Sequence, residues 1–210
     1  MSITNGYLTV AEATAYTGKT TSADPTILED VITACSRMVD RYCGRHFFQV
    51  AATARIFDAT TPYRLELGPF NDLVTLTTLK SDDDGSGTYE VTYSASQYQL
   101  APPGATTRAP LAVPYTSIEL LSGYTFPTDV ASGRLGLIEV TGTWGWPTAV
   151  PTEVKQATRI LVAEVAKLQD APFGVLGNDL TGIQFAPRQM PNAAKRLLQP
   201  FVHPSHVGIG

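Results

Sequence analysis

The feature that most constrains the fold is a change in hydrophobic periodicity, from helical to strand-like and back again. Apolar residues recur at helical spacing over residues 24–43 and again over 152–169. Between them, from Arg45 to about Gly145, the chain carries short β-branched and aromatic segments separated by Pro, Gly and Asp. These segments are "FFQVAATARIFD", "RLELG", "LVTLTTLK", "TYEVTYS", "YQLAPP", "SIELL" and "LIEVTGTW". Antiparallel hairpins bracketed by helices predict an α+β fold.

The predicted fold is a small helical bundle with a β-rich antiparallel insertion and an extended C-terminal arm. The bundle has two long helices and a short N-terminal helix, which a capping box at Thr9 and Glu12 begins and which ends near Gly18. We therefore divide the chain into N-terminal helices, a β-rich insertion, a long C-terminal helix and an arm. Their bounds are 1–44, 45–150, 151–170 and 171–210.

Composition limits the possible functions. Charged residues make up 16% of the 210 residues, against about 25% in a typical soluble protein, so we expect much of the surface to face other protein. A net charge of -4 argues against an electrostatic grip on nucleic acid. The N-terminus lacks the pattern of a signal peptide and no apolar run is long enough to span a bilayer, so we expect a soluble intracellular protein. Cys35 and Cys43 are about 12 Å apart along one helix and should be buried and unbridged.

Three consecutive carboxylates, Asp82 to Asp84, raise the question of a calcium site. A loop of the EF-hand type started at Asp82 has Asp84, Ser86 and Gly87 in register, but Tyr93 stands where the closing carboxylate is required. The flanking segments are also strand-like rather than helical. We favour a hairpin tip in which the glycines supply left-handed positions and the carboxylates are solvated, with a metal site as the alternative.

No other motif predicts catalysis. The sequence "TGKTT" at 17–21 would need a glycine where Ala13 stands, and it follows a helix rather than a strand. We expect His203 and His206 in "HPSH" to lie in a solvated tail, because no further ligand completes a metal cage. There is no nucleophile elbow and no evident Ser/His/Asp triad. The prediction is a non-enzymatic protein with no catalytic residue, cofactor or metal, although a hydrolase with a carboxylate pair stays open.

Two tryptophans allow a competing function. Trp144 and Trp146 can form a platform for sugars or bases, together with tyrosines, or can be buried where the last strand meets the last helix. We favour burial. The platform would make the protein a carbohydrate- or surface-binding β module, and such a module would be a stable monomer.

Four stretches together resemble the head-to-tail connector, or head-completion adaptor, family of long-tailed bacteriophages. They are "YLTVAEATAYTG", "VDRYCGRHF", "VTLTTLKSDDDGSGTYEVTYSASQYQL" and "IEVTGTWGWPTAVPTEVKQATRILVAEVAK" followed by "APFGV", spanning most of residues 7–175. The resemblance implies a structural virion protein of the neck, made in the host cytoplasm. It implies a homo-oligomeric ring, a dodecamer, that binds the portal protein and a stopper or other neck protein. DNA would only pass through the channel, and no membrane is involved.

The C-terminal arm is our predicted portal-binding segment. It is rich in Pro and Gly but keeps large apolar residues, which favours ordering on a partner, with a short helix over 192–199. Aromatic and arginine side chains commonly dominate such interfaces. The predicted apolar anchors and cations are Phe173, Leu176, Phe185, Arg188, Lys195, Arg196, Leu197, Leu198 and Phe201. The alternative is that the arm folds back on its own subunit.

Overall fold

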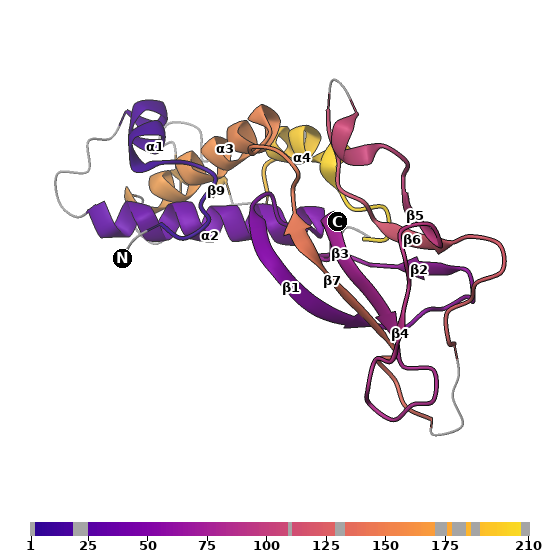
Figure 1. Cartoon of the computed structure of the whole chain (residues 1–210). Helices are drawn as coiled ribbons and strands as arrows, with labels where there is room; N and C mark the ends of the chain where they lie inside the picture. The colour runs from indigo at the N-terminus through magenta and orange to yellow at the C-terminus, as the bar shows by residue number, and fades with distance from the viewer. Residues whose placement is uncertain are drawn as a thin grey trace. The chain divides into compact units, whose positions relative to one another are not determined.

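The chain forms two compact units. The computed structural model describes residues 3–18, 25–108, 111–128, 133–170, 176–177, 184–185 and 190–206. The helical unit comprises Met1–Gly44 and Val150–Gly210, and the β unit comprises Arg45–Ala149 (Figure 1). The described residues contain helices and antiparallel sheets, so the predicted α+β class is confirmed.

The helical unit is arranged around one central helix. Helix α3 packs against α1, α2 and α4, and α2 also contacts α1 and α4. The long helices α2 and α3 begin and end within about one residue of the bounds that periodicity predicts. The helices are α1 (Val10–Thr17), α2 (Pro25–Cys43), α3 (Thr152–Asp170) and α4 (Asn192–Leu198), followed by the short helix η3 (Gln199–Phe201). A small hairpin, β8 (Leu176–Gly177) with β9 (Gln184–Phe185), lies between α3 and α4 in the sequence.

The predicted capping box fixes the start of α1. The Thr9 hydroxyl accepts the Glu12 backbone N–H at 3.1 Å, and a Glu12 carboxylate oxygen accepts the Thr9 N–H at 2.8 Å. The same carboxylate lies 3.6 Å from Lys155 Nζ and 3.4 Å from Arg159 Nη2 on α3. These hydrogen bonds and cations hold the pKa of Glu12 below its usual range. One side chain therefore both begins α1 and attaches it to α3.

A buried polar network holds the N-terminal segment on α2. The Tyr7 hydroxyl donates to the carboxylate of Asp40, which is 2% exposed, and Arg37 Nε lies 3.1 Å from the second Asp40 oxygen. The Ser36 hydroxyl accepts the Tyr7 N–H at 3.1 Å, and Arg37 donates to the Asn5 carbonyl at 2.7 Å. A buried carboxylate with two such partners is satisfied within the unit, so this network is structural.

The β unit contains two antiparallel sheets. The larger sheet has the strand order β1-β7-β3-β4, with β7 (Ile138–Gly145) between β1 (Gln49–Phe57) and β3 (Leu73–Ser81). The smaller sheet has the order β2-β6-β5, and a backbone bridge from Leu73 to Tyr115 links it to the larger one. Each segment predicted as a strand contains one. The remaining strands are β2 (Arg64–Glu66), β4 (Val91–Thr92), β5 (Tyr98–Ala101) and β6 (Ser117–Leu120), with a short helix η1 (Ala105–Thr107).

One hydrophobic core lies between the two sheets. Strands β3 and β7 alternate buried and more exposed residues over much of their length, as expected for a sheet with one buried face. Their buried side chains meet those of β2 and β6 in the same cluster. The largest of these are Leu65, Leu73, Leu79, Ile118, Ile138 and Trp144, each at most 1% exposed. The β-rich segment therefore has a core of its own.

Candidate functional site

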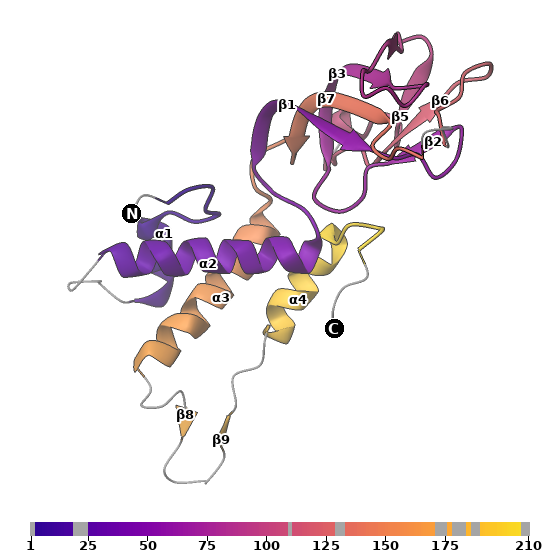
Figure 2. The ribbon, with the colours of Figure 1, turned by 90° about the horizontal axis from the view of Figure 1, so that it is seen from below.

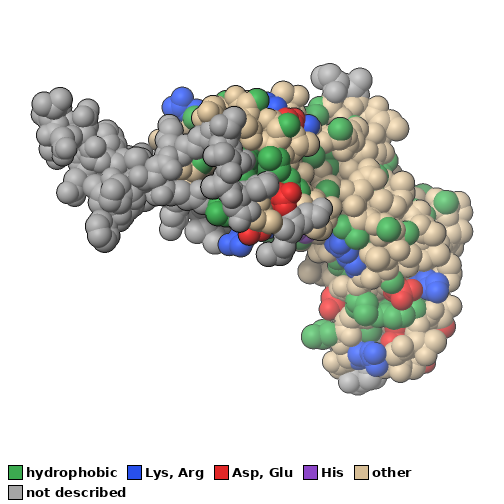
Figure 3. All heavy atoms as spheres, turned by 90° about the vertical axis from the view of Figure 1, so that its left-hand side faces the viewer, with side chains coloured by type: hydrophobic (Ala, Val, Ile, Leu, Met, Phe, Trp, Pro, Cys, Tyr) green, Lys and Arg blue, Asp and Glu red, His purple; other side chains and the backbone are tan. Residues whose placement is uncertain are grey.

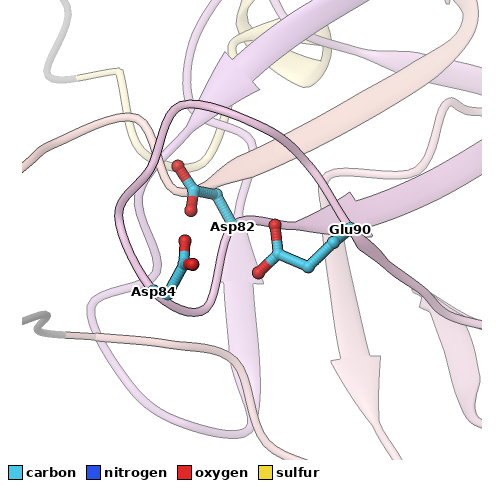
Figure 4. A group of neighbouring side chains, drawn as sticks. All are labelled: Asp82, Asp84 and Glu90. Atoms are coloured by element: carbon cyan, nitrogen blue, oxygen red, sulfur yellow. The ribbon is translucent and has the colours of Figure 1, made fainter.

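The acidic loop, residues 82–90, joins β3 to β4. Strands β3 and β4 pair through Lys80–Thr92 and Ser81–Val91, so the predicted hairpin is present. Gly85 and Gly87 have φ of +72° and +95°, the left-handed conformations expected there. Oxygen atoms of Asp82, Asp84 and Glu90 all lie within 4.8 Å of one another (Figure 4). Three convergent carboxylates are a donor set that a hard cation such as Ca²⁺ accepts.

Hydrogen bonds within the loop account for this arrangement. Asp82 accepts the backbone N–H groups of Ser86 and Gly87 at 3.0 and 2.8 Å. Asp84 also accepts the Ser86 N–H at 2.9 Å, and hydrogen bonds with Ser86 lower the pKa of Asp84. Our expectation that these carboxylates are all solvated was wrong for Asp82, which is 1% exposed. Its position is explained by the two backbone N–H groups of the loop that it satisfies.

A second carboxyl with a displaced pKa is Asp72, which follows a turn and precedes β3. It lies 3.4 Å from Arg45 Nε, and both side chains are almost fully buried. Burial raises the pKa of Asp72 to about 7, against the opposing effect of Arg45, His46 and Arg55. A displaced pKa in a cleft is a signal for catalysis, but this carboxyl is 1% exposed and inaccessible to a substrate.

Both tryptophans are core residues. Trp144 and Trp146 are each 1% exposed, and the Trp144 indole donates to the Thr53 carbonyl at 2.9 Å. The Arg45 and Arg55 guanidinium carbons lie 5.6 and 4.4 Å from the ring centroids of Trp146 and Trp144. The favoured prediction of burial is therefore confirmed. A sugar-binding platform formed by these two rings is excluded, because neither face is open to a ligand.

The C-terminal segment, residues 190–206, folds back on the helical unit. The His203 N–H donates to the Cys43 carbonyl at 2.8 Å, and His206 Nε2 lies 3.0 Å from the Arg41 carbonyl. Both carbonyls belong to the last turn of α2, whose end is marked by Gly44 at φ +65°. His203 is 1% exposed, so our expectation of a solvated tail was wrong. The segment instead satisfies orphan carbonyls of α2.

The predicted portal-binding residues fall into four groups. Leu198 and Phe201 are 0% and 4% exposed inside their own unit. Lys195 and Leu197 are half-buried, and Arg196 is exposed on α4. Phe173 and Arg188 lie outside the described residues, whereas Leu176 and Phe185 pair in the β8–β9 hairpin. For residues 190–206 the alternative of a fold-back is thus the observed arrangement.

One face of the molecule shows how the charged side chains of the described residues are distributed (Figure 3). On the face drawn in Figure 3, Lys and Arg side chains are interspersed with Asp and Glu and with hydrophobic side chains. This distribution agrees with the net charge of -4 and differs from the basic stripe of a nucleic-acid-binding surface. Among the helices of the described residues, none is both long and apolar enough to cross a membrane.

Sequence reasoning overlooked the surfaces that carry no motif. Exposed large apolar residues lie on both units, among them Tyr16 and Ile27 on the helical unit and Leu135 on the β unit, which is 79% exposed. The two cysteines are free and buried as predicted, and burial raises the pKa of Cys35 to about 12. In the sequence, the one indication that apolar side chains would be exposed was the low share of charged residues, 16%.

Comparisons with known proteins give no match by sequence and several by structure. Neither a scan of protein-family models nor a search of curated proteins finds a match. Among solved structures, a chain in the neck of an empty gene transfer agent (GTA) particle, computed with C6 symmetry, aligns with a TM-score of 0.56 at 20% identity. The alignment covers 96% of this chain and 92% of that one.

Two further structures agree. A chain from the virion of a native GTA particle aligns with a TM-score of 0.54 at 20% identity, covering 96% of this chain and 92% of that chain. A chain from the neck of the native particle, computed with C12 symmetry, gives 0.50 at 21% identity and covers 96% and 91%. The coverage includes nearly the whole of each chain, so the likeness shows a shared fold across both units.

Proposed function

We propose that the protein is a structural subunit of a virion neck, a head-to-tail connector of a phage-like particle. In this role it forms a homo-oligomeric ring, a dodecamer, beneath the portal and joins the capsid to a stopper or other tail protein. The observation that carries the proposal is the fold shared over 96% of the chain with a subunit of a GTA neck. The C6 and C12 symmetries of the GTA necks support a ring, and the C12 symmetry supports twelve copies in it.

The residues of the chain support a role without catalysis. Two carboxyls that could suggest catalysis, those of Asp72 and Asp82, are each only 1% exposed. Both interact with groups of their own unit and are not accessible to a substrate. A conduit needs no active site, and its lining must not hold DNA strongly. A net charge of -4 fits passage of DNA, because a basic channel would bind the phosphates and release their counterions.

We assign portal binding to the outward side of α4. Leu198 and Phe201 hold this helix on its own unit, which leaves Lys195, Arg196 and Leu197 toward solvent. Two cations beside a partly exposed leucine form the type of surface that binds an apolar patch rimmed by acidic residues. Lys195 and Arg196 occupy the last turn of α4, where cations also favour the helix dipole.

The role itself is tested by electron microscopy of the purified protein mixed with the portal protein encoded beside it. We expect a second ring on the narrow end of the portal. The experiment uses this protein at a concentration well above that of the portal. Portals without a second ring, beside free monomers of this protein, would refute the connector role.

The portal contact is tested by the double variant Lys195→Glu/Arg196→Glu. Each new carboxylate would face acidic groups of the portal, so we expect portal affinity to fall by about tenfold or more. Arg108→Glu, a reversal at an exposed residue of the β unit, is the matched control and should bind like the wild type. Equal affinity of all three proteins would show that α4 is not the contact. Deleting the arm is a poorer test, because deletion removes Leu198 and Phe201 from the core.

A further inference from the structure

Helix α2 has a second apolar stripe, which is only partly buried in the described residues. We call Ile27, Val31, Ala34 and Met38 the α2 outer seam. Their spacings of four, three and four residues place them on one side of the helix over about 16 Å. Ile27 is 51% exposed, Ala34 is exposed, and the other two are half-buried. Figures 1 and 2 show α1 and α3 on one side of α2, and the exposure of Ile27 and Ala34 shows that the seam is partly open to solvent.

The seam is distinct from the face that α2 buries in its own unit. Leu28, Ile32, Cys35, Val39 and Cys43 form the buried face, at most 6% exposed. The outer seam is displaced from it by one residue, which is about 100° around the helix. An amphipathic surface helix normally needs one apolar stripe, so the second stripe indicates a second packing partner.

Helix α3 has an outer face of complementary charge. Its exposed or half-exposed side consists of Glu153, Gln156, Ile160, Ala163 and Glu164. The cations on the adjoining side of α3, Lys155 and Arg159, already face Glu12 on α1. The α3 outer face therefore presents two apolar side chains between two exposed glutamates.

The α2 surface carries an exposed cation at one end. Arg41, in the last turn of α2, is seven residues beyond Ala34 and lies on the same side as the seam. Asp30 is exposed near the N-terminal end of α2 and would repel a glutamate of α3. This repulsion favours an alignment of the two helices in which only the Arg41 end of α2 meets the α3 outer face. Because α2 and α3 pack through their buried faces, the α2 outer seam and the α3 outer face are two separate surfaces of one subunit.

We propose, on the premise of the ring described above, that the α2 outer seam of each copy packs on the α3 outer face of the next copy. Arg41 of one copy then meets Glu153 or Glu164 of its neighbour. A contact between two different surfaces of a subunit is a heterologous contact, and its repetition closes a ring when the rotation between copies allows it. The occupant of the seam is a second copy of this chain, identified by apolar and charge complementarity.

Two charge-reversal variants test the contact. Variant A is Arg41→Glu, and variant B is Glu153→Arg with Glu164→Arg. All three positions are exposed, so the reversals leave the core intact. In a ring of A alone or of B alone, like charges meet at every contact. In an equimolar mixture, the acidic α2 of A meets the basic α3 of B, while the α2 of B meets the α3 of A.

We expect A and B alone to need about tenfold more protein than the wild type to form rings on the portal, and the mixture to recover alternating rings. The readout is the mass and composition of the assembly by native mass spectrometry. A mixture that assembles no better than A and B separately would overturn the pairing. Far-UV ellipticity melts identify any variant whose fold has changed.

A second pair of variants tests the seam without charge pairing. Ala34→Asp places a carboxylate in the α2 outer seam, and Ala51→Asp makes the same change at an exposed position of the β unit. We expect only Ala34→Asp to prevent ring formation. If wild-type rings form and Ala34→Asp rings form equally well, the inference fails while the connector role stands. If the wild type never adds to the portal, the proposed function fails instead.

Discussion

Replacing Leu198 with alanine tests whether the C-terminal segment is part of the helical core. Leu198 is 0% exposed on α4, which packs against α3. The change removes three carbon atoms, worth about 2 kcal/mol of transfer free energy at about 0.8 kcal/mol each. The cavity left behind adds to this, so we expect the free energy of unfolding to fall by about 3 kcal/mol, within the range of about 2–5 known for such changes.

The assay must report on the helical unit. Both tryptophans of the chain lie in the β unit, so their fluorescence follows the unfolding of that unit. Far-UV ellipticity during urea denaturation follows the helices, most of which belong to the helical unit. We expect Leu198→Ala to lower the midpoint of the ellipticity transition more than that of the fluorescence transition.

The neighbouring Leu197 supplies the control. It is half-buried on the same helix, so Leu197→Ala removes the same atoms with a smaller loss of buried area, and we expect a cost below about 1 kcal/mol. If the arm instead orders only on a partner, with Leu198 facing outward, Leu198→Ala should cost no more stability than Leu197→Ala in the isolated protein. Equal stability of Leu198→Ala and the wild type would refute the packing of α4 described here.

Three further predictions concern single buried groups. Burial raises the pKa of Asp72 to about 7, so between about pH 4 and pH 7 the folded β unit keeps a proton that the unfolded chain has lost. The free energy of unfolding should therefore fall as pH rises through this window, by at most about 1.4 kcal/mol per pH unit. Asp72→Asn should flatten this slope in urea titrations followed by tryptophan fluorescence. Gly145 has φ +110°, and an added Cβ would lie 1.9 Å from the Phe48 carbonyl oxygen. Gly145→Ala should therefore destabilise the β unit by about 2 kcal/mol or more in the same assay. An unchanged denaturation midpoint would contradict this backbone contact. Tyr7→Phe removes a hydrogen bond to the buried Asp40 carboxylate and should cost the helical unit about 1–3 kcal/mol by far-UV ellipticity, whereas Tyr16→Phe on the exposed side of α1 should cost little.

Periodicity and local capping signals predict the secondary structure of this chain well. Thr9 and Glu12 begin α1 where a capping box requires it, and Gly18 ends the helix in a left-handed conformation. These signals succeed because both partners of each hydrogen bond lie within one turn of the helix. The hairpin at 79–93 is predicted for the same reason, since its register depends on neighbouring strands and glycines.

Tertiary context decides the residues that sequence reasoning misplaced. His203 was expected in solvent because its neighbours in the sequence are proline, serine and a second histidine. Its position depends on the Cys43 carbonyl, 160 residues earlier in the chain, which no local pattern reveals. Asp82 is buried, whereas Asp83 and Asp84 are exposed. The side chain of Asp82 points into the loop, where it accepts the backbone N–H groups of Ser86 and Gly87.

The residues with the most conspicuous chemistry are also those least available to a partner. Asp40, Asp72 and Asp82 are at most 2% exposed, and the two indoles are covered by arginines. A buried charge persists only where nearby groups stabilise it, so such residues are fixed by the fold of their own unit. An interface between copies has the opposite requirement, because its side chains must stay accessible until assembly. Among the accessible surfaces of the described residues are the α2 outer seam and the cations of α4, which no sequence motif marks. For this reason a search for motifs finds no site, whereas exposure and charge complementarity are the basis for the two interfaces proposed above.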